Sequence, residues 1–135
     1  MTFEDIIRLH PQPTSVDRAA LAGCITACLD CEASCSACAD ASLSEPDVPE
    51  MRRCIRLCLD CADTCTATVR VATRQSEVDL DLLRAIVDAC SRVCGASAEE
   101  CERHAAHHEH CRVCAEVCRR CTRACDDLVA AIGGP

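Results

Sequence analysis

Cysteine is the residue type through which this chain can do most chemistry, because it makes up 17 of the 135 residues. The stretch CITACLDCEASCSAC begins at Cys24 and carries cysteines at intervals of four, three, four and three residues. In a helix these intervals place the side chains on one stripe, where a soluble protein normally carries leucine, isoleucine or valine. Thiolates are ligands for soft metal ions, so the pattern predicts a helix whose inward face binds metal.

The same intervals recur in three later segments. The four sets are Cys24, Cys28, Cys31, Cys35 and Cys38; Cys54, Cys58, Cys61 and Cys65; Cys90, Cys94 and Cys101; and Cys111, Cys114, Cys118, Cys121 and Cys125. In the third set the vacant column position is Ser97, and the first two sets share the motif CLDC. A free cysteine is often just a small buried hydrophobe, but seventeen on inward stripes bring no packing advantage over larger side chains. We therefore predict that all seventeen line one metal-binding interior.

Proline and polar segments separate these stripes. Pro11 and Pro13 end a leader, residues 1–13, that can form a short helix, and residues 14–135 follow as one domain. Thr14 or Ser15 is expected to cap the first long helix and Ser76 the third. The expected helices cover about 14–43, 47–74, 77–106 and 108–132. Because the connections are short, neighbours should be antiparallel, and the fold class is an all-α antiparallel four-helix bundle.

Antiparallel packing brings the four cysteine zones to one end of the bundle. Each zone lies next to the loop at 42–50 or the loop at 104–110, and at 1.5 Å per residue it extends roughly 25 to 30 Å inward. Beyond the cysteines the stripes become aliphatic, at Leu21, Leu80, Leu83, Val87, Leu128 and Ile132. The pattern predicts a thiol-lined tube that is closed by an apolar plug at the far end.

Histidine and methionine continue the stripes toward the loops. His104 and His108 follow Cys101, while His107 precedes Cys111 and Met51 precedes Cys54. Imidazole and thioether groups also bind soft or borderline ions, so these four residues are predicted ligands at the mouth of the tube. His110 ranks below them, and His10, in the leader, is not expected to take part.

The arrangement of the thiols favours copper(I) over other soft ions. Each Cu⁺ replaces one thiol proton, so many ions fit into a dry interior without accumulating buried charge. Zinc with four thiolates leaves about two excess negative charges per site, and structural zinc sites are closed groups of four ligands. Iron–sulfur clusters also need only about four ligands each, in characteristic loop spacings. The expected cargo is therefore several copper(I) ions per chain, bound without catalysis.

Composition and charge limit the binding partners and the cellular compartment that we expect. The net charge of −8 argues against nucleic-acid partners, which require a basic surface. The start of the chain, MTFEDIIRLHPQP, does not read as a signal peptide, and no run of 18 apolar residues predicts a membrane span. These features predict a cytoplasmic protein with reduced thiols, and an odd number of cysteines also disfavours a disulfide scaffold.

With these ladders, the CLDC repeat and the histidine-rich mouth, the chain resembles the cytosolic branch of the bacterial copper storage proteins over residues 14–132. The resemblance implies a homotetramer of bundles that stores many copper(I) ions per subunit, with uptake at the polar end. Alternatives are a zinc or general soft-metal buffer, a copper chaperone, or a thiol enzyme that uses a CxxC pair such as Cys28 and Cys31. Asp30 and Asp60 should face away from the seam, and Asp60 is a further candidate for guiding cations.

Overall fold

The computed structural model describes residues 1–133 and contains five α-helices and one 3-10 helix. No strand occurs among these residues, which confirms the all-α class. The elements are α1 (Phe3–Arg8), α2 (Arg18–Leu43), η1 (Val48–Met51), α3 (Arg52–Thr73), α4 (Leu80–His104) and α5 (Glu109–Ile132). The short leader helix predicted from the sequence is α1.

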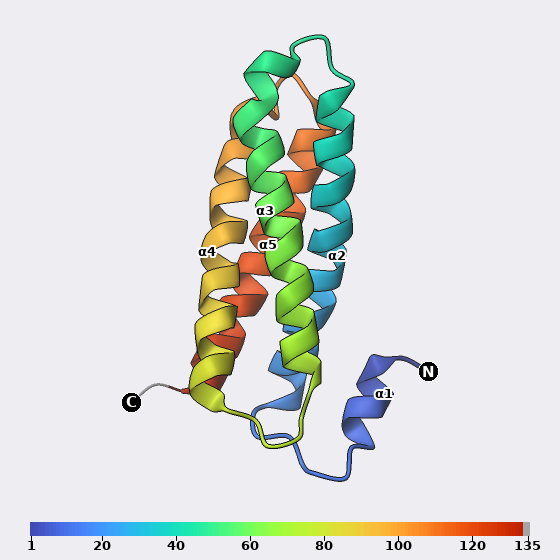
Figure 1. The fold of residues 1–135 in the computed structure, drawn as a ribbon, viewed down its shortest axis with the longest axis vertical. Helices are drawn as coiled ribbons and strands as arrows, with labels where there is room; N and C mark the ends of the chain where they lie inside the picture. The colour runs from blue at the N-terminus through green and yellow to red at the C-terminus, as the bar shows by residue number, and fades with distance from the viewer. Residues whose placement is uncertain (134–135) are drawn as a thin grey trace.

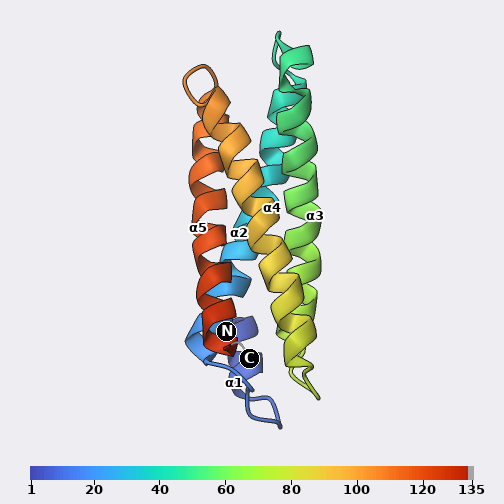
Figure 2. The same cartoon turned by 90° about the vertical axis from the view of Figure 1, so that its left-hand side faces the viewer.

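The four long helices form an antiparallel bundle (Figure 1). Helix α2 packs against α3 and α5, and α4 packs against the same two neighbours, so the helices form a closed ring around a common axis. Residues 44–51 and 105–108 connect the helices at one end, which we call the mouth. The α3–α4 loop, α1 and the C-terminal end of α5 lie at the opposite end, as Figure 2 also shows.

Aspartates set the starts of two long helices. The Asp17 carboxylate accepts hydrogen bonds from the backbone N–H groups of Ala19 and Ala20, at 2.8 and 3.2 Å. Asp79 accepts one from the backbone N–H of Leu82 at 3.1 Å. The expected hydroxyl caps, Thr14 or Ser15 and Ser76, are therefore wrong. A carboxylate is a charged acceptor that also complements the helix dipole, so it caps a helix more favourably than a hydroxyl group does. Because Asp17 is the cap, α2 begins at Arg18.

All seventeen cysteines are buried and free, and Cys38 is the most exposed of them at 3%. At the end opposite the mouth, the plug is formed by Leu21, Val87 and Leu128, which are fully buried, and by Leu83. Leu80, expected in the plug, is 37% exposed because it is the first residue of α4 and lies at the helix edge. The structure therefore has a sulfur zone toward the mouth and an aliphatic zone behind it.

Helix α2 is long and apolar enough to cross a membrane, judged by length and composition alone. Much of that apolarity comes from cysteine and alanine, and 44% of the most apolar window is buried inside the protein. Core helices of bundles meet the same criterion, so this feature carries little weight.

Candidate metal centre

Sulfur atoms from all four long helices meet along the bundle axis. The shortest separations are 3.2 Å between Cys61 Sγ of α3 and Cys94 Sγ of α4, and 3.4 Å between Cys35 Sγ of α2 and Cys118 Sγ of α5. The helices come this close because cysteine is short and because small residues are buried beside the cysteine stripes, among them Ala62 of α3. Larger side chains at these positions would push the helices apart.

The thiols form overlapping groups in which every sulfur lies within 4.8 Å of the others. Four such groups have four members each: Cys28, Cys90, Cys121 and Cys125; Cys31, Cys65, Cys94 and Cys121; Cys31, Cys35, Cys61 and Cys118; and Cys38, Cys54, Cys58 and Cys101. Cys31 and Cys121 each belong to two of these groups. Each group draws its members from three or four helices, so a bound ion would link helices that are distant in sequence.

Contacts with neighbouring thiols, together with burial, raise the pKa of some of these thiols in the metal-free protein. The hydrogen bond with Cys38, together with burial, raises the pKa of Cys111 to about 12. Contacts with Cys101 and Cys118, and burial, raise the pKa of Cys114 as well. Because thiolate is the species that binds metal, an incoming cation has to displace these protons.

At the mouth, His110 lies nearest to the thiols. Its Nδ1 atom is 3.4 Å from Cys38 Sγ and 3.6 Å from Cys111 Sγ. The sequence ranks His110 below the other mouth histidines, because the chain turns between α4 and α5 and spacing alone does not determine which side chain faces inward. His108 is the residue before α5, so His110 lies in the first turn of α5, opposite Cys38. The position of His110 follows from the residue at which α5 begins, and the spacing of residues in the sequence does not determine that residue.

The other predicted mouth ligands lie at different depths. His104 and His108 have ring centroids 6.5 Å apart, and the rings of His108 and His110 stack at 5.6 Å. Met51 is completely buried in η1. His107 is exposed at the surface of the loop. The structure thus brings three imidazoles together and leaves the His107 ring outside this group.

Each imidazole of this group faces a carboxylate. His104 Nε2 is 3.0 Å from the nearly buried Glu100, His108 Nε2 is 3.0 Å from Asp47, and His110 Nε2 is 3.2 Å from Glu45. Glu45 also contacts His108. The hydrogen bond that His108 donates to the Asp47 carboxylate raises the pKa of His108.

For His110, burial opposes protonation, but the contacts with Cys38 and Glu45 outweigh it and raise the pKa of the ring. The mouth therefore carries a cluster of imidazole and carboxylate groups next to the sulfur zone.

Asp30 and Asp60 face away from the thiols, as expected. Asp30 pairs with Arg120 at 3.0 Å and Asp60 with Arg56 at 3.0 Å, and both carboxylates are about half exposed.

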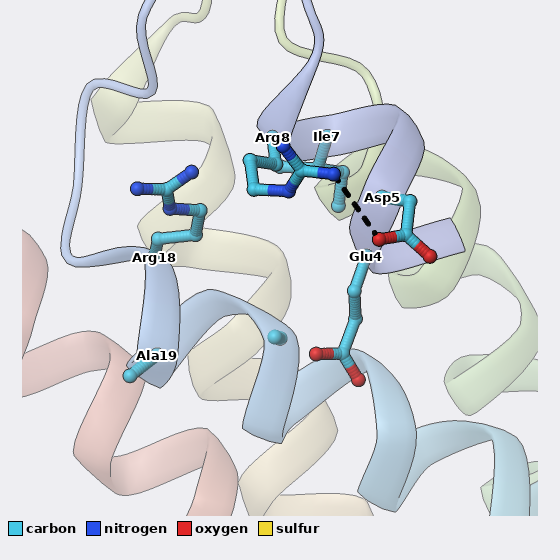
Figure 3. A pocket seen from close by; sticks show the side chains of 7 residues that line it. Glu4, Asp5, Ile7, Arg8, Arg18 and Ala19 are labelled. Carbon is cyan, nitrogen blue, oxygen red and sulfur yellow. Dashed lines mark hydrogen bonds and ion pairs between the residues drawn. The ribbon is translucent and has the colours of Figure 1, made fainter. Parts of the chain in front are cut away.

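A separate cavity of about 340 Å³ lies between α1 and the start of α2, at the end opposite the mouth. Figure 3 shows Arg8 in an ion pair with Asp5, with Arg18 across the opening. Glu4, Ile7, Ala19 and Ala22 complete the lining, so no thiol or imidazole faces this cavity. His10, also at this end, contacts Ser76 and Gln12.

Comparison with known proteins shows which family this chain belongs to. The sequence model of the copper storage protein family, Csp, matches residues 17–130. The chain belongs to the copper storage protein family. Among characterised members of the family, the copper storage protein Ccsp from Streptomyces lividans, loaded with 10 copper equivalents, has 51% sequence identity and a TM-score of 0.94. The match covers 96% of this chain and 99% of that one.

Two further family structures and one sequence relative are similar to this chain. The cytosolic Streptomyces lividans protein with five coppers has 54% identity and a TM-score of 0.82, over 83% of this chain and 93% of that one. The copper(I)-bound copper storage protein BsCsp3 of Bacillus subtilis has 32% identity and a TM-score of 0.73, over 82% and 98%. An uncharacterized cysteine-rich protein of Bacillus subtilis, YhjQ, is 34% identical over 79% of this chain and 94% of its own length.

Proposed function

We propose that this chain is a high-capacity store for copper(I) in the cytoplasm, without catalytic activity. The observation that carries the proposal is the set of seventeen buried, free thiols arranged in overlapping groups that share sulfur atoms. Shared sulfur suits copper(I), which accepts low coordination numbers and replaces one proton per ion, so the dry interior stays close to neutral as it fills.

The proposed ligands are all seventeen cysteines, with His104, His107, His108 and Met51 at the mouth, as the sequence predicts. We add His110, because its ring contacts the outermost thiols. Copper(I) is expected to enter at the mouth, since the opposite end is closed by Leu21, Val87 and Leu128.

The geometry disfavours the alternative functions. A chaperone or a thiol enzyme needs an accessible cysteine, but no cysteine in this chain is more than 3% exposed. Zinc is disfavoured by charge, because each ion held by four thiolates would leave about two excess negative charges per site in this buried interior. By the family relationship we also propose a homotetramer, which light scattering on the reduced protein would check.

Titration of the reduced apoprotein with copper(I), against a chromogenic copper(I) chelator, tests the storage function. We expect binding to continue until the copper content approaches one ion per thiol. A matched variant in which Cys54, Cys58, Cys61 and Cys65 are replaced by alanine should lose about a quarter of the capacity while the remaining thiols still load. Saturation of the unmodified chain at about four ions or fewer, as in a closed structural site, would contradict the proposal.

A further inference from the structure

Glu100 of α4 is the only buried residue with a charged side chain among residues 1–133, and that side chain is 8% exposed. It directly precedes Cys101 and lies one helical turn before His104. Burying a carboxylate is costly unless charged or hydrogen-bonding partners surround it. The partners of Glu100 therefore show what this side chain does at the mouth.

The two oxygens of the Glu100 carboxylate have different partners. Oε1 is 3.5 Å from Arg53 Nε of α3 and 3.8 Å from Arg103 Nη1 of α4. Oε2 is 3.0 Å from Nε2 of His104. The two arginines thus hold the carboxylate in place by one oxygen, and the other oxygen is directed at the His104 ring.

This contact determines which ring nitrogen of His104 can bind a metal ion. A carboxylate has no proton to donate, so Nε2 of His104 must donate the hydrogen bond to Glu100. In a neutral imidazole the other nitrogen then carries the lone pair. Nδ1 is therefore the atom of His104 that remains for copper(I), and within residues 1–133 it has no hydrogen-bond partner.

His110 has the same arrangement and shows where the second nitrogen leads. Glu45 contacts Nε2 of His110 at 3.2 Å. Nδ1 of this ring faces the thiols, at 3.4 Å from Cys38 Sγ and 3.6 Å from Cys111 Sγ. His108 differs, because carboxylates contact both of its ring nitrogens. Two of the three clustered imidazoles thus have a carboxylate on Nε2 alone.

We propose that Glu100 is a positioning residue for copper(I) uptake. It holds His104 in the Nε2–H tautomer and keeps Nδ1 available to receive the ion at the mouth. This inference rests on the proposed function. Glu100 does not bind copper(I) itself, since a carboxylate is a hard ligand and copper(I) selects soft ones.

The expected effect falls on the rate of uptake and not on the capacity of the store. A carboxylate that accepts a hydrogen bond from a ligating histidine fixes the ring orientation and raises the basicity of the ligand. Loss of such a partner typically costs about 10- to 100-fold in metal affinity or activity. Because thiols hold the stored metal, the total amount of copper bound should not depend on Glu100.

The test is the initial rate at which the reduced apoprotein takes limiting copper(I) from a chromogenic chelator in stopped-flow mixing. Glu100→Ala should slow this rate by about tenfold and leave the copper content at saturation unchanged. Glu100→Gln should keep most of the rate, because the amide oxygen still accepts the hydrogen bond from His104. Glu102→Ala is the matched control, since Glu102 lies on the same helix and pairs with Arg119 instead of a histidine.

A double variant separates positioning from a purely structural role. If Glu100 acts through His104, then Glu100→Ala should cause no further slowing in a His104→Ala background. Nitrogen-15 chemical shifts of the His104 ring, measured on the apoprotein in mildly alkaline solution, give a readout that does not involve copper. They should report the Nε2–H tautomer in the unmodified chain and a mixture of tautomers in Glu100→Ala.

Circular dichroism checks that each apo variant is folded. The bundle should tolerate Glu100→Ala, because Arg53 and Arg103 are 70% and 64% exposed and no charge is left buried without a partner.

An unchanged uptake rate in a folded Glu100→Ala variant, an equal slowing in the His104→Ala background, or an unchanged ring tautomer would each overturn the positioning role. These outcomes leave the storage function intact. That function fails only if the unmodified chain does not take up copper(I) in large amount.

Discussion

Replacing Leu128 with alanine should destabilise the metal-free bundle far more than removing any one thiol. Leu128 is fully buried in the plug, and truncation removes three carbon atoms from a site that the surrounding helices cannot refill. We expect a loss of about 3 kcal/mol in the free energy of unfolding, within the usual range of about 2 to 5 kcal/mol for such changes. For a domain of this size the melting temperature should fall by roughly 10 °C.

The comparison variant is Cys121→Ala, which removes a single sulfur atom that contacts Cys28, Cys65 and Cys94. Its cost should be about 1 kcal/mol, since one buried heavy atom is lost. Leu82→Ala is the control at the same end of the bundle, because Leu82 is 66% exposed, and it should change stability by about 0.5 kcal/mol or less.

Urea unfolding of the reduced apoproteins measures all three variants. If Leu128→Ala costs no more than Cys121→Ala, the aliphatic plug does not stabilise the empty bundle and the thiols must do so. Copper loading should raise the stability of both Leu128→Ala and the unmodified chain, because metal–thiolate bonds then hold the four helices together.

Three further changes test other parts of the structure. His108→Gln should lower the melting temperature of the apoprotein near pH 5.5 and leave it unchanged near pH 9. The reason is that Asp47 raises the folded-state pKa of His108, so this contribution is complete below the unfolded pKa and disappears as the pH rises through the folded one. Ser91→Ala should cost about 1 to 2 kcal/mol in urea unfolding, because Ser91 Oγ donates a 2.5 Å hydrogen bond to the Asp126 carboxylate; an effect below about 0.5 kcal/mol would contradict this. His110→Ala should slow copper(I) uptake in stopped-flow mixing more than His107→Ala, since only His110 contacts thiols, and equal rates for the two variants would argue against a role for His110.

The sequence predicts the sulfur zone well because cysteine spacing is a periodic property of each helix. The three- and four-residue intervals between cysteines, from Cys24 to Cys125, determine which face of each helix turns inward. The same intervals show that Ser97 stands where a cysteine would be expected. Short connections then determine that the four zones meet at one end. No property of a single residue beyond helix geometry is needed for these predictions.

The helix ends and the mouth depend on competition between local groups, which spacing does not resolve. Asp17 and Asp79 cap their helices in preference to the hydroxyl groups of Ser15 and Ser76, because a carboxylate interacts more strongly with the helix N-terminus. The direction of the His110 ring depends on the turn between α4 and α5, so its contact with Cys38 emerges only from the three-dimensional structure.

When a thiol-lined interior is closed at one end, the depth at which a copper ion is bound determines how readily that ion exchanges. Because Leu21, Val87 and Leu128 close the far end, an ion bound next to them can leave only past the thiols that lie nearer the mouth. A cell that holds this protein would thus possess, in the same molecule, copper ions that exchange readily and copper ions that exchange slowly. A brief pulse of a copper isotope, given late in loading, should reappear in the medium ahead of the metal acquired earlier.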